Sequence, residues 1–147
     1  MAQVSVSLCH GLRLNKMSSG KAAGVVRSLT LILNAFAKVG MPDKHLFETV
    51  AGVLYTAADV RAKDGVSGSG LFDAQSVANL MNAYAKAGML DQEIFDVLTV
   101  EAKALDTSSL EGQHVANILN SVVKGGHKDK ELFDRMKEAI IKSVSHL

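Results

Sequence analysis

The stretch NLMNAYAKAGMLDQEIFDVL, residues 79–98, decides the fold because the chain contains three versions of it. An upstream version reads LILNAFAKVGMPDKHLFETV at residues 31–50, and a downstream version reads NILNSVVKGGHKDKELFDRM at residues 117–136. Self-similarity at such a period is typical of helical-repeat proteins, in which each unit buries its apolar face against its neighbours. The sequence therefore predicts a stack of similar units.

Each version predicts a helix, a short turn and a second helix. In the middle version, apolar side chains recur at i, i+3, i+4, i+7 and i+8, which is one stripe of an α-helix. These side chains are Val77, Leu80, Met81, Tyr84 and Ala85. Ten extra residues between the first and second versions are placed in the Gly/Ser-rich segment 62–70, which we interpret as a surface loop.

Five positions are identical in all three versions. They are Asn34/Asn82/Asn120, Lys38/Lys86/Lys124, Gly40/Gly88/Gly126, Asp43/Asp91/Asp129 and Phe47/Phe95/Phe133. The glycine is expected to end the first helix in the left-handed conformation, and the aspartate to cap the second helix. The phenylalanine then begins the buried stripe of that second helix.

We accordingly expect an all-α fold, a short right-handed α-solenoid of about three helical hairpin repeats. A second prediction concerns the fifth helix, where Ser108 and Glu111 have the spacing of a capping box. The predicted helices cover residues 20–39, 43–62, 73–87, 91–105, 109–124 and 129–145.

Charge divides the chain into two predicted parts. Residues 1–42 carry five basic side chains and no acidic one, whereas residues 43–147 carry 11 basic and 15 acidic side chains. An acid-free start rich in basic residues and serine is typical of an organellar transit peptide, and a basic arm is the alternative reading. We therefore divide the chain into an N-terminal extension, residues 1–19, and a helical repeat domain, residues 20–147.

No pattern of catalytic or metal-binding residues is found. The single cysteine, Cys9, excludes an intrachain disulfide and a zinc site with two or more cysteines. The five histidines form no ligand pair such as HExxH, and no nucleophile elbow is present. No apolar run reaches the ~20 residues that span a bilayer. We expect no enzyme activity, cofactor, metal, small-molecule substrate or membrane span.

The repeated Asn and Lys lie four residues apart, so each pair shares one side of its helix. In a stack they would form two columns, in which lysine could neutralise phosphates and asparagine could contact base edges. A structural role is the alternative, because a lysine in the last turn of a helix also complements the helix dipole. The candidate RNA-binding residues are Arg13, Lys16, Lys21, Arg27, Asn34, Lys38, Asn82, Lys86, Asn120 and Lys124.

The segment LFDAQSVANLMNAYAKAGMLDQEIFDVL, residues 71–98, resembles the helical-pair repeat of the heptatricopeptide and octotricopeptide families. The two other versions resemble it more loosely, and the likeness covers about residues 25–142. These repeats accompany RAP domains in organellar RNA-binding proteins, including components of apicomplexan mitochondrial ribosomes. The resemblance implies an α-solenoid that binds organellar RNA or is a structural component of a mitochondrial ribosome.

We therefore expect a non-catalytic, RNA-binding or structural component of a mitochondrial ribosome or a related organellar ribonucleoprotein. Its partners would be organellar, chiefly ribosomal, RNA and the neighbouring proteins of a large assembly. The expected location is the mitochondrion, with the plastid or cytoplasm as alternatives. The competing hypothesis is a protein–protein scaffold, or an accessory subunit of a mitochondrial complex, without RNA contact.

Overall fold

Six α-helices and one short 3₁₀ helix form the ordered framework of the computed structural model, which describes residues 17–63 and 70–147. The all-α prediction is confirmed for these residues, and five of the six helices start and end within one residue of the expected bounds. The predicted extension and Gly/Ser loop lie mostly outside the described residues. The helices are α2 (Ser19–Lys38), α3 (Lys44–Lys63), α4 (Ala74–Lys86), α5 (Gln92–Ala104), η2 (Thr107–Ser109), α6 (Gly112–Lys124) and α7 (Lys130–Ser145).

The turn after the first helix of each pair has the same hydrogen-bonding geometry in all three versions. Gly88 has φ +71°, and the Met89 N–H donates to the carbonyl of Tyr84 at 2.8 Å. Gly40 and Gly126 have φ +70° and +76°, with equivalent bonds from the residues that follow them. This is a Schellman motif, whose left-handed residue is glycine because a Cβ is strained there. The predicted role of the glycines is confirmed.

The second helix of each pair is capped by the aspartate that recurs in the three versions, as predicted. Oδ1 of Asp91 accepts the backbone N–H of Ile94 at 3.0 Å. Asp43 and Asp129 cap α3 and α7 in the same way, each at 2.8 Å. A carboxylate at this position satisfies a free N–H and complements the positive end of the helix dipole.

The start of α6 differs from the prediction. The Asp106 carboxylate accepts the Ser108 N–H at 3.0 Å, which closes the 3₁₀ turn η2 and prevents Ser108 from acting as the helix cap. The α-helix begins instead at Gly112, with Glu111 as its N-cap residue and the Glu111 N–H donating to Nδ1 of His114 at 3.1 Å. The predicted Ser108/Glu111 pair is therefore wrong, and the capping pair is Glu111 and His114.

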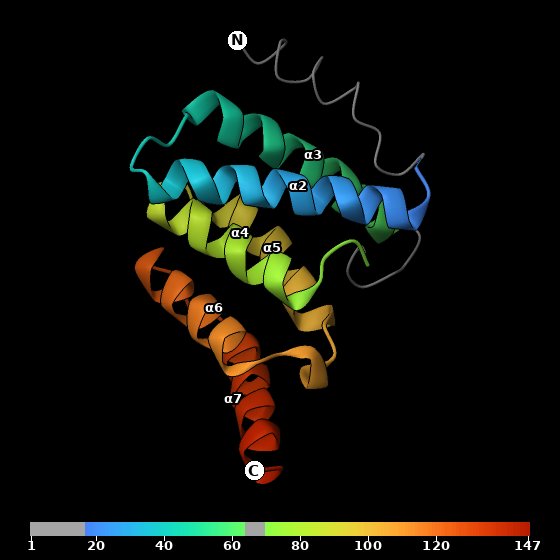
Figure 1. Ribbon diagram of the computed structural model, residues 1–147, viewed down its shortest axis with the longest axis vertical. Coiled ribbons are helices and arrows are strands. Elements are labelled where there is room, and N and C mark those ends of the chain that lie inside the picture. Colours follow the sequence, from blue (N-terminus) through green and yellow to red (C-terminus); the bar gives the residue numbers. More distant parts are fainter. Residues whose placement is uncertain (1–16, 64–69) are drawn as a thin grey trace.

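The helices pack so that α4 lies between α2 and α6, while α5 contacts both α3 and α7 (Figure 1). The inner position of α4 explains its composition, since nearly every side chain that faces a neighbour is buried and small or apolar. The C-terminal ends of α2, α4 and α6 lie at the same edge of the molecule, on the left in Figure 1. The identical turns of the three versions are thereby gathered along that edge.

The phenylalanine that recurs in the three versions shows where the packing between helix pairs is complete. Phe47 and Phe95 are 1% and 3% exposed, because each is covered by the following helix pair. Phe133, at the same position of α7, is 39% exposed, since no further helix pair of the described chain covers it. Ile141 and Val144 on α7 are also exposed, so this helix presents an apolar surface.

Candidate functional site

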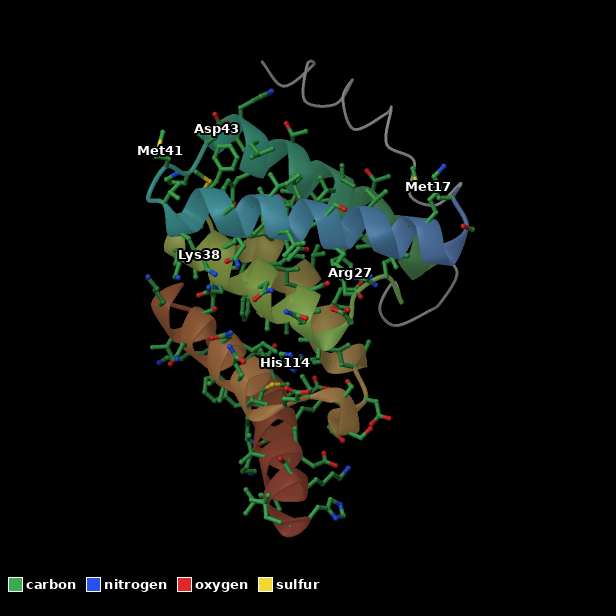
Figure 2. The ribbon with its side chains drawn as sticks, viewed as in Figure 1. Met17, Arg27, Lys38, Met41, Asp43 and His114 are labelled. Carbon is green, nitrogen blue, oxygen red and sulfur yellow. The ribbon has the colours of Figure 1, made fainter. Side chains whose placement is uncertain are left out.

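A row of lysines lies at the edge formed by the C-terminal ends of the three first helices. Lys38, Lys86 and Lys124 are the last residues of α2, α4 and α6, and all three side chains are exposed. Lys38 lies at the end of α2 next to the turn that carries Met41 and Asp43, and far from Met17 (Figure 2). Among the described residues, none of the three ammonium groups is engaged in an ion pair, so the row is available to an external anion.

The asparagines of the same helices do not form an equally accessible row. Asn34 and Asn82 are half-buried, whereas Asn120 is exposed. Oδ1 of Asn34 is fully buried and has no hydrogen-bond partner within the described chain. A base edge cannot reach an atom that is covered in this way, so direct base contact is restricted at this position.

The remaining candidates are separated from the lysine row. Arg27 lies along the middle of α2, away from Lys38 (Figure 2), and its Nε is 3.9 Å from Oδ2 of Asp73. The Asp73 carboxylate also accepts the Ser76 N–H, and its pKa is lowered because this bond and Arg27 outweigh the opposing effect of burial. Lys21 is exposed near the other end of α2. Arg13 and Lys16 lie outside the described residues.

A groove that the sequence did not predict lies between α3 and α5. Its volume is about 440 Å³. Aromatic and aliphatic side chains form its apolar wall, and three carboxylates and one lysine contribute charge. The lining includes Phe47, Ala51, Tyr55, Tyr84, Met89 and Ile94, with Lys44, Glu48, Asp91 and Glu93 as the charged members.

Two tyrosines line this groove, and Tyr84 is held there by a ring contact and a hydrogen bond. The Tyr84 ring packs edge-on against Phe47, at a centroid distance of 5.1 Å and an interplanar angle of 82°, and its hydroxyl donates to the Phe47 carbonyl at 2.7 Å. Burial, followed by the charges of Asp91 and Glu93, raises the pKa of Tyr55 to about 12. Burial also raises the pKa of Tyr84. Both hydroxyls are therefore neutral donors near neutral pH.

The contact between α5 and α7 is built from the same positions but is closed by an ion pair. Lys103 occupies the position in α5 that Tyr55 occupies in α3, because each lies 12 residues after the capping aspartate. Its Nζ is 3.0 Å from Oδ2 of Asp129 and 2.9 Å from Oε2 of Glu131. Asp129 and Glu131 correspond in turn to Asp91 and Glu93 in the α3–α5 contact.

The ion pair shifts the pKa of both partners. Burial lowers the pKa of Lys103, but the hydrogen bonds from Lys103 to Glu131 and Asp129 outweigh this and leave it raised. Burial likewise raises the pKa of Asp129, but the Leu132 N–H and the Lys103 ammonium outweigh this and leave it lowered. Both groups are charged in the folded state around neutral pH.

From the sequence, the repeated aspartate was expected only to cap the second helix. The signal for the groove was present in the alignment of the three versions, as the unlike residues Tyr55, Lys103 and Ile141 at one position. Its meaning required knowing which helices lie side by side, because the acids that face Tyr55 come from the next helix pair.

Comparison with known proteins finds no matching family model, no similar curated protein and no matching solved structure. Among the described helices, none combines the length and apolar character needed to cross a membrane. Within residues 17–63 and 70–147, no group of three His, Cys, Asp or Glu side chains is placed to hold a metal ion.

Proposed function

We propose that the chain is a short right-handed α-solenoid of three helical hairpins that serves, without catalysis, as an RNA-contacting structural component of an organellar ribonucleoprotein. The observation that carries this proposal is the row formed by Lys38, Lys86 and Lys124. The position of α4 between α2 and α6 supports the solenoid, because equivalent helices then repeat in one direction. The resemblance to organellar RNA-binding repeats supports the mitochondrial ribosome as the assembly.

The lysine row suits phosphate contact more than base recognition. A solvent-exposed ammonium that pairs with a phosphate releases a condensed counterion, and this release provides most of the sequence-independent affinity for RNA. The half-buried asparagines, with Oδ1 of Asn34 covered, limit hydrogen bonding to base edges. We therefore propose that the protein contacts the sugar–phosphate backbone of folded or single-stranded RNA. Additional neighbours would place the protein in the assembly.

The test is RNA binding as a function of salt. Fluorescence anisotropy with a labelled 20-nucleotide single-stranded RNA would compare the wild-type chain with the variant K38Q/K86Q/K124Q. Each phosphate contact contributes about 0.7 to the slope of log affinity against log salt for a single strand, so the variant should reduce the slope by about 2. The matched control is K130Q/K137Q/K142Q, which removes equal charge from lysines that are already paired with acids on α7.

An equal loss of slope in both variants would show a nonspecific charge effect and reject the lysine row as the RNA contact. The proposed location has its own test, which is sedimentation of the native protein with organellar ribosomes. Release of the protein from these particles by high salt is expected if phosphates contribute to its attachment.

The second candidate function is a protein–protein scaffold, and it is favoured by the exposed apolar side chains of α7. Phe133, Ile141 and Val144 lie at the end of the helical stack and remain open to solvent. Apolar residues at the centre of a contact usually provide more binding energy than rim charges. Under this hypothesis F133S/I141S would release the protein from its native particles, whereas K38Q/K86Q/K124Q would not.

A further inference from the structure

The two contacts between neighbouring second helices differ in whether a lysine is paired with the acids at the start of the later helix. In the contact between α5 and α7, Oδ1 of Asp129 caps the helix and Oδ2 binds the Lys103 ammonium. In the contact between α3 and α5, Oδ1 of Asp91 makes the same capping bond. No described residue forms an ion pair with Asp91 or Glu93, so the cation that would correspond to Lys103 is missing from this contact.

The space for that cation is present. Replacement of a lysine by Tyr55 at the equivalent position leaves the groove of about 440 Å³ open between α3 and α5. Asp91, Glu93 and Glu48 supply three carboxylates to its lining, against the single ammonium of Lys44. Lys44 is itself exposed and is 3.7 Å from Glu48, so the other two carboxylates have no charge partner within the described part of the chain.

We propose that this groove binds a lysine side chain from a partner polypeptide, whose ammonium takes the place at Asp91 and Glu93 that Lys103 takes at Asp129 and Glu131. The contact between α5 and α7 is the model for this proposal, because there the two carboxylates already bind a lysine side chain. This site is separate from the lysine row, so it would recruit a basic protein segment whether or not the row contacts RNA.

The wall of the groove suits the rest of a lysine side chain. Four methylene groups precede the ammonium, and long basic side chains pack these methylenes along apolar surface while the charge stays at the rim. Tyr55 and Met89, the half-buried apolar members of the lining, provide this surface. Tyr55 lines the groove together with the two carboxylates, and its neutral phenol adds a hydrogen-bonding group without adding charge.

The test is an NMR titration of the complete chain with two matched peptides. The probes are acetyl-Gly-Lys-Gly-amide and acetyl-Gly-norleucine-Gly-amide, which have similar apolar side chains and differ in the ammonium. We expect saturable shifts of the Tyr55, Asp91 and Glu93 amide signals, with the lysine peptide binding about fivefold more tightly, which is the upper range for exposed ion pairs.

Two variants distinguish binding at the proposed site from nonspecific electrostatic attraction. D91N/E93Q removes both charges, and asparagine is as good an N-cap as aspartate, so the fold is retained and the lysine preference should disappear. Tyr55→Lys supplies the missing ammonium from the chain itself and should reduce binding of the lysine peptide at least about fivefold. The matched control, Ile141→Lys, introduces a lysine at the equivalent exposed position of α7 and should leave binding of the lysine peptide unchanged.

Each result of these titrations decides the proposal. Loss of the lysine preference in both D91N/E93Q and Tyr55→Lys, with Ile141→Lys unchanged, supports it. Equal binding of the two peptides to the wild-type chain, or absence of saturable shifts, overturns it. Tighter binding of putrescine than of the lysine peptide would assign the groove to a free diamine and overturn the polypeptide partner.

Discussion

The contact between the α2/α3 and α4/α5 pairs and the contact between the α4/α5 and α6/α7 pairs share the same turns and helix caps but differ in side-chain chemistry. We refer to them as the first and second junctions. The first contains the edge-on Phe47–Tyr84 pair and the hydroxyl bond to the Phe47 carbonyl. The second contains Phe95 stacked on His127, at 4.1 Å and 4°, with Nε2 of His127 bonded to the Leu90 carbonyl at 2.5 Å.

Polar contacts between helices are also distributed unequally. The second junction is joined by Lys103 to Asp129 and Glu131, and by a bond of 2.6 Å from Arg135 to the Leu105 carbonyl. On its α3–α5 side, the first junction has an open groove and no equivalent cation. The comparison shows that turns and caps fix how the helices are placed, whereas single side chains decide whether a junction is closed or can accept a partner.

The largest expected effect concerns the phenylalanine that both junctions share. Phe47→Ala and Phe95→Ala should each reduce the free energy of unfolding by about 3–4 kcal/mol, because each removes a buried aromatic ring and leaves a cavity. Phe133→Ala at the exposed position should reduce it by less than about 1 kcal/mol, since most of its effect depends on burial. Urea unfolding followed by far-UV circular dichroism measures all three variants.

Equal destabilisation by the three alanine variants would contradict the exposure of Phe133 and indicate that α7 is covered in solution. A concentration-dependent unfolding midpoint would then show whether a second copy supplies the cover.

A smaller effect is expected from the tyrosine hydroxyl, which only the first junction contains. Tyr84→Phe keeps the ring contact with Phe47 and removes a buried hydrogen bond, so the free energy of unfolding should fall by about 1–2 kcal/mol. The control is Tyr55→Phe, whose hydroxyl is only partly buried, and its effect should stay below about 0.5 kcal/mol. Similar losses of unfolding free energy in the two variants would contradict the prediction that the Tyr84 hydroxyl contributes more to stability than the Tyr55 hydroxyl.

The ion pair of the second junction should contribute less, because its partners are partly solvated. Lys103→Met should reduce the free energy of unfolding by about 1 kcal/mol at neutral pH. The lowered pKa of Asp129 gives stability that is present above its unfolded pKa and is lost as pH falls through the folded pKa. The raised pKa of Lys103 gives stability that is lost as pH rises through its folded pKa.

The difference between wild type and Lys103→Met should therefore be largest around neutral pH and shrink at both extremes. Urea unfolding at several pH values measures this difference, with Lys137→Met as the matched variant of an exposed pair on α7. A difference that does not change with pH would mean that packing of the lysine methylenes, rather than charge, is what the substitution removes.

Local chemistry made the helices predictable from the sequence. Gly88 and Asp91 specify a helix end and a helix start within four residues, and three copies of this signal predicted the ends of α2, α4 and α6 and the starts of α3, α5 and α7 to within one residue. The start of α6, the fifth helix in chain order, differs from the prediction because Asp106 competes for the Ser108 N–H, a local alternative that the capping-box pattern does not reveal. Helix propensity and capping depend on residues that are close in the sequence, so errors in the predictions made from them are confined to helix ends.

The sites were less predictable because they combine different helix pairs. The exposure of Lys38 follows from its place in the last helical turn, and the sequence indicated it. The buried Oδ1 of Asn34 and the meeting of Tyr55 with Asp91 depend on how neighbouring pairs pack, which a pattern within one copy does not encode. Comparison of unlike residues at equivalent positions is the sequence signal that points to such contacts.

The last prediction concerns the pKa of Tyr55, which tests the open state of the first junction directly. The chain contains two tyrosines, so a Tyr84→Phe background leaves Tyr55 as the only phenol that absorbs at 295 nm on ionisation. In the folded chain its pKa should be about 12, because burial and then the charges of Asp91 and Glu93 oppose ionisation. Since the folded pKa is raised, this group's contribution to stability should be lost as pH rises from about 10 to about 12. Adding D91N/E93Q should lower the folded pKa toward its ordinary value without reaching it, because burial is the larger cause and is unchanged. A folded-state pKa near 10 in the Tyr84→Phe background would show that Tyr55 does not face the two carboxylates, and the contrast between the junctions would then rest on Lys103, on Arg135 and on the two aromatic pairs.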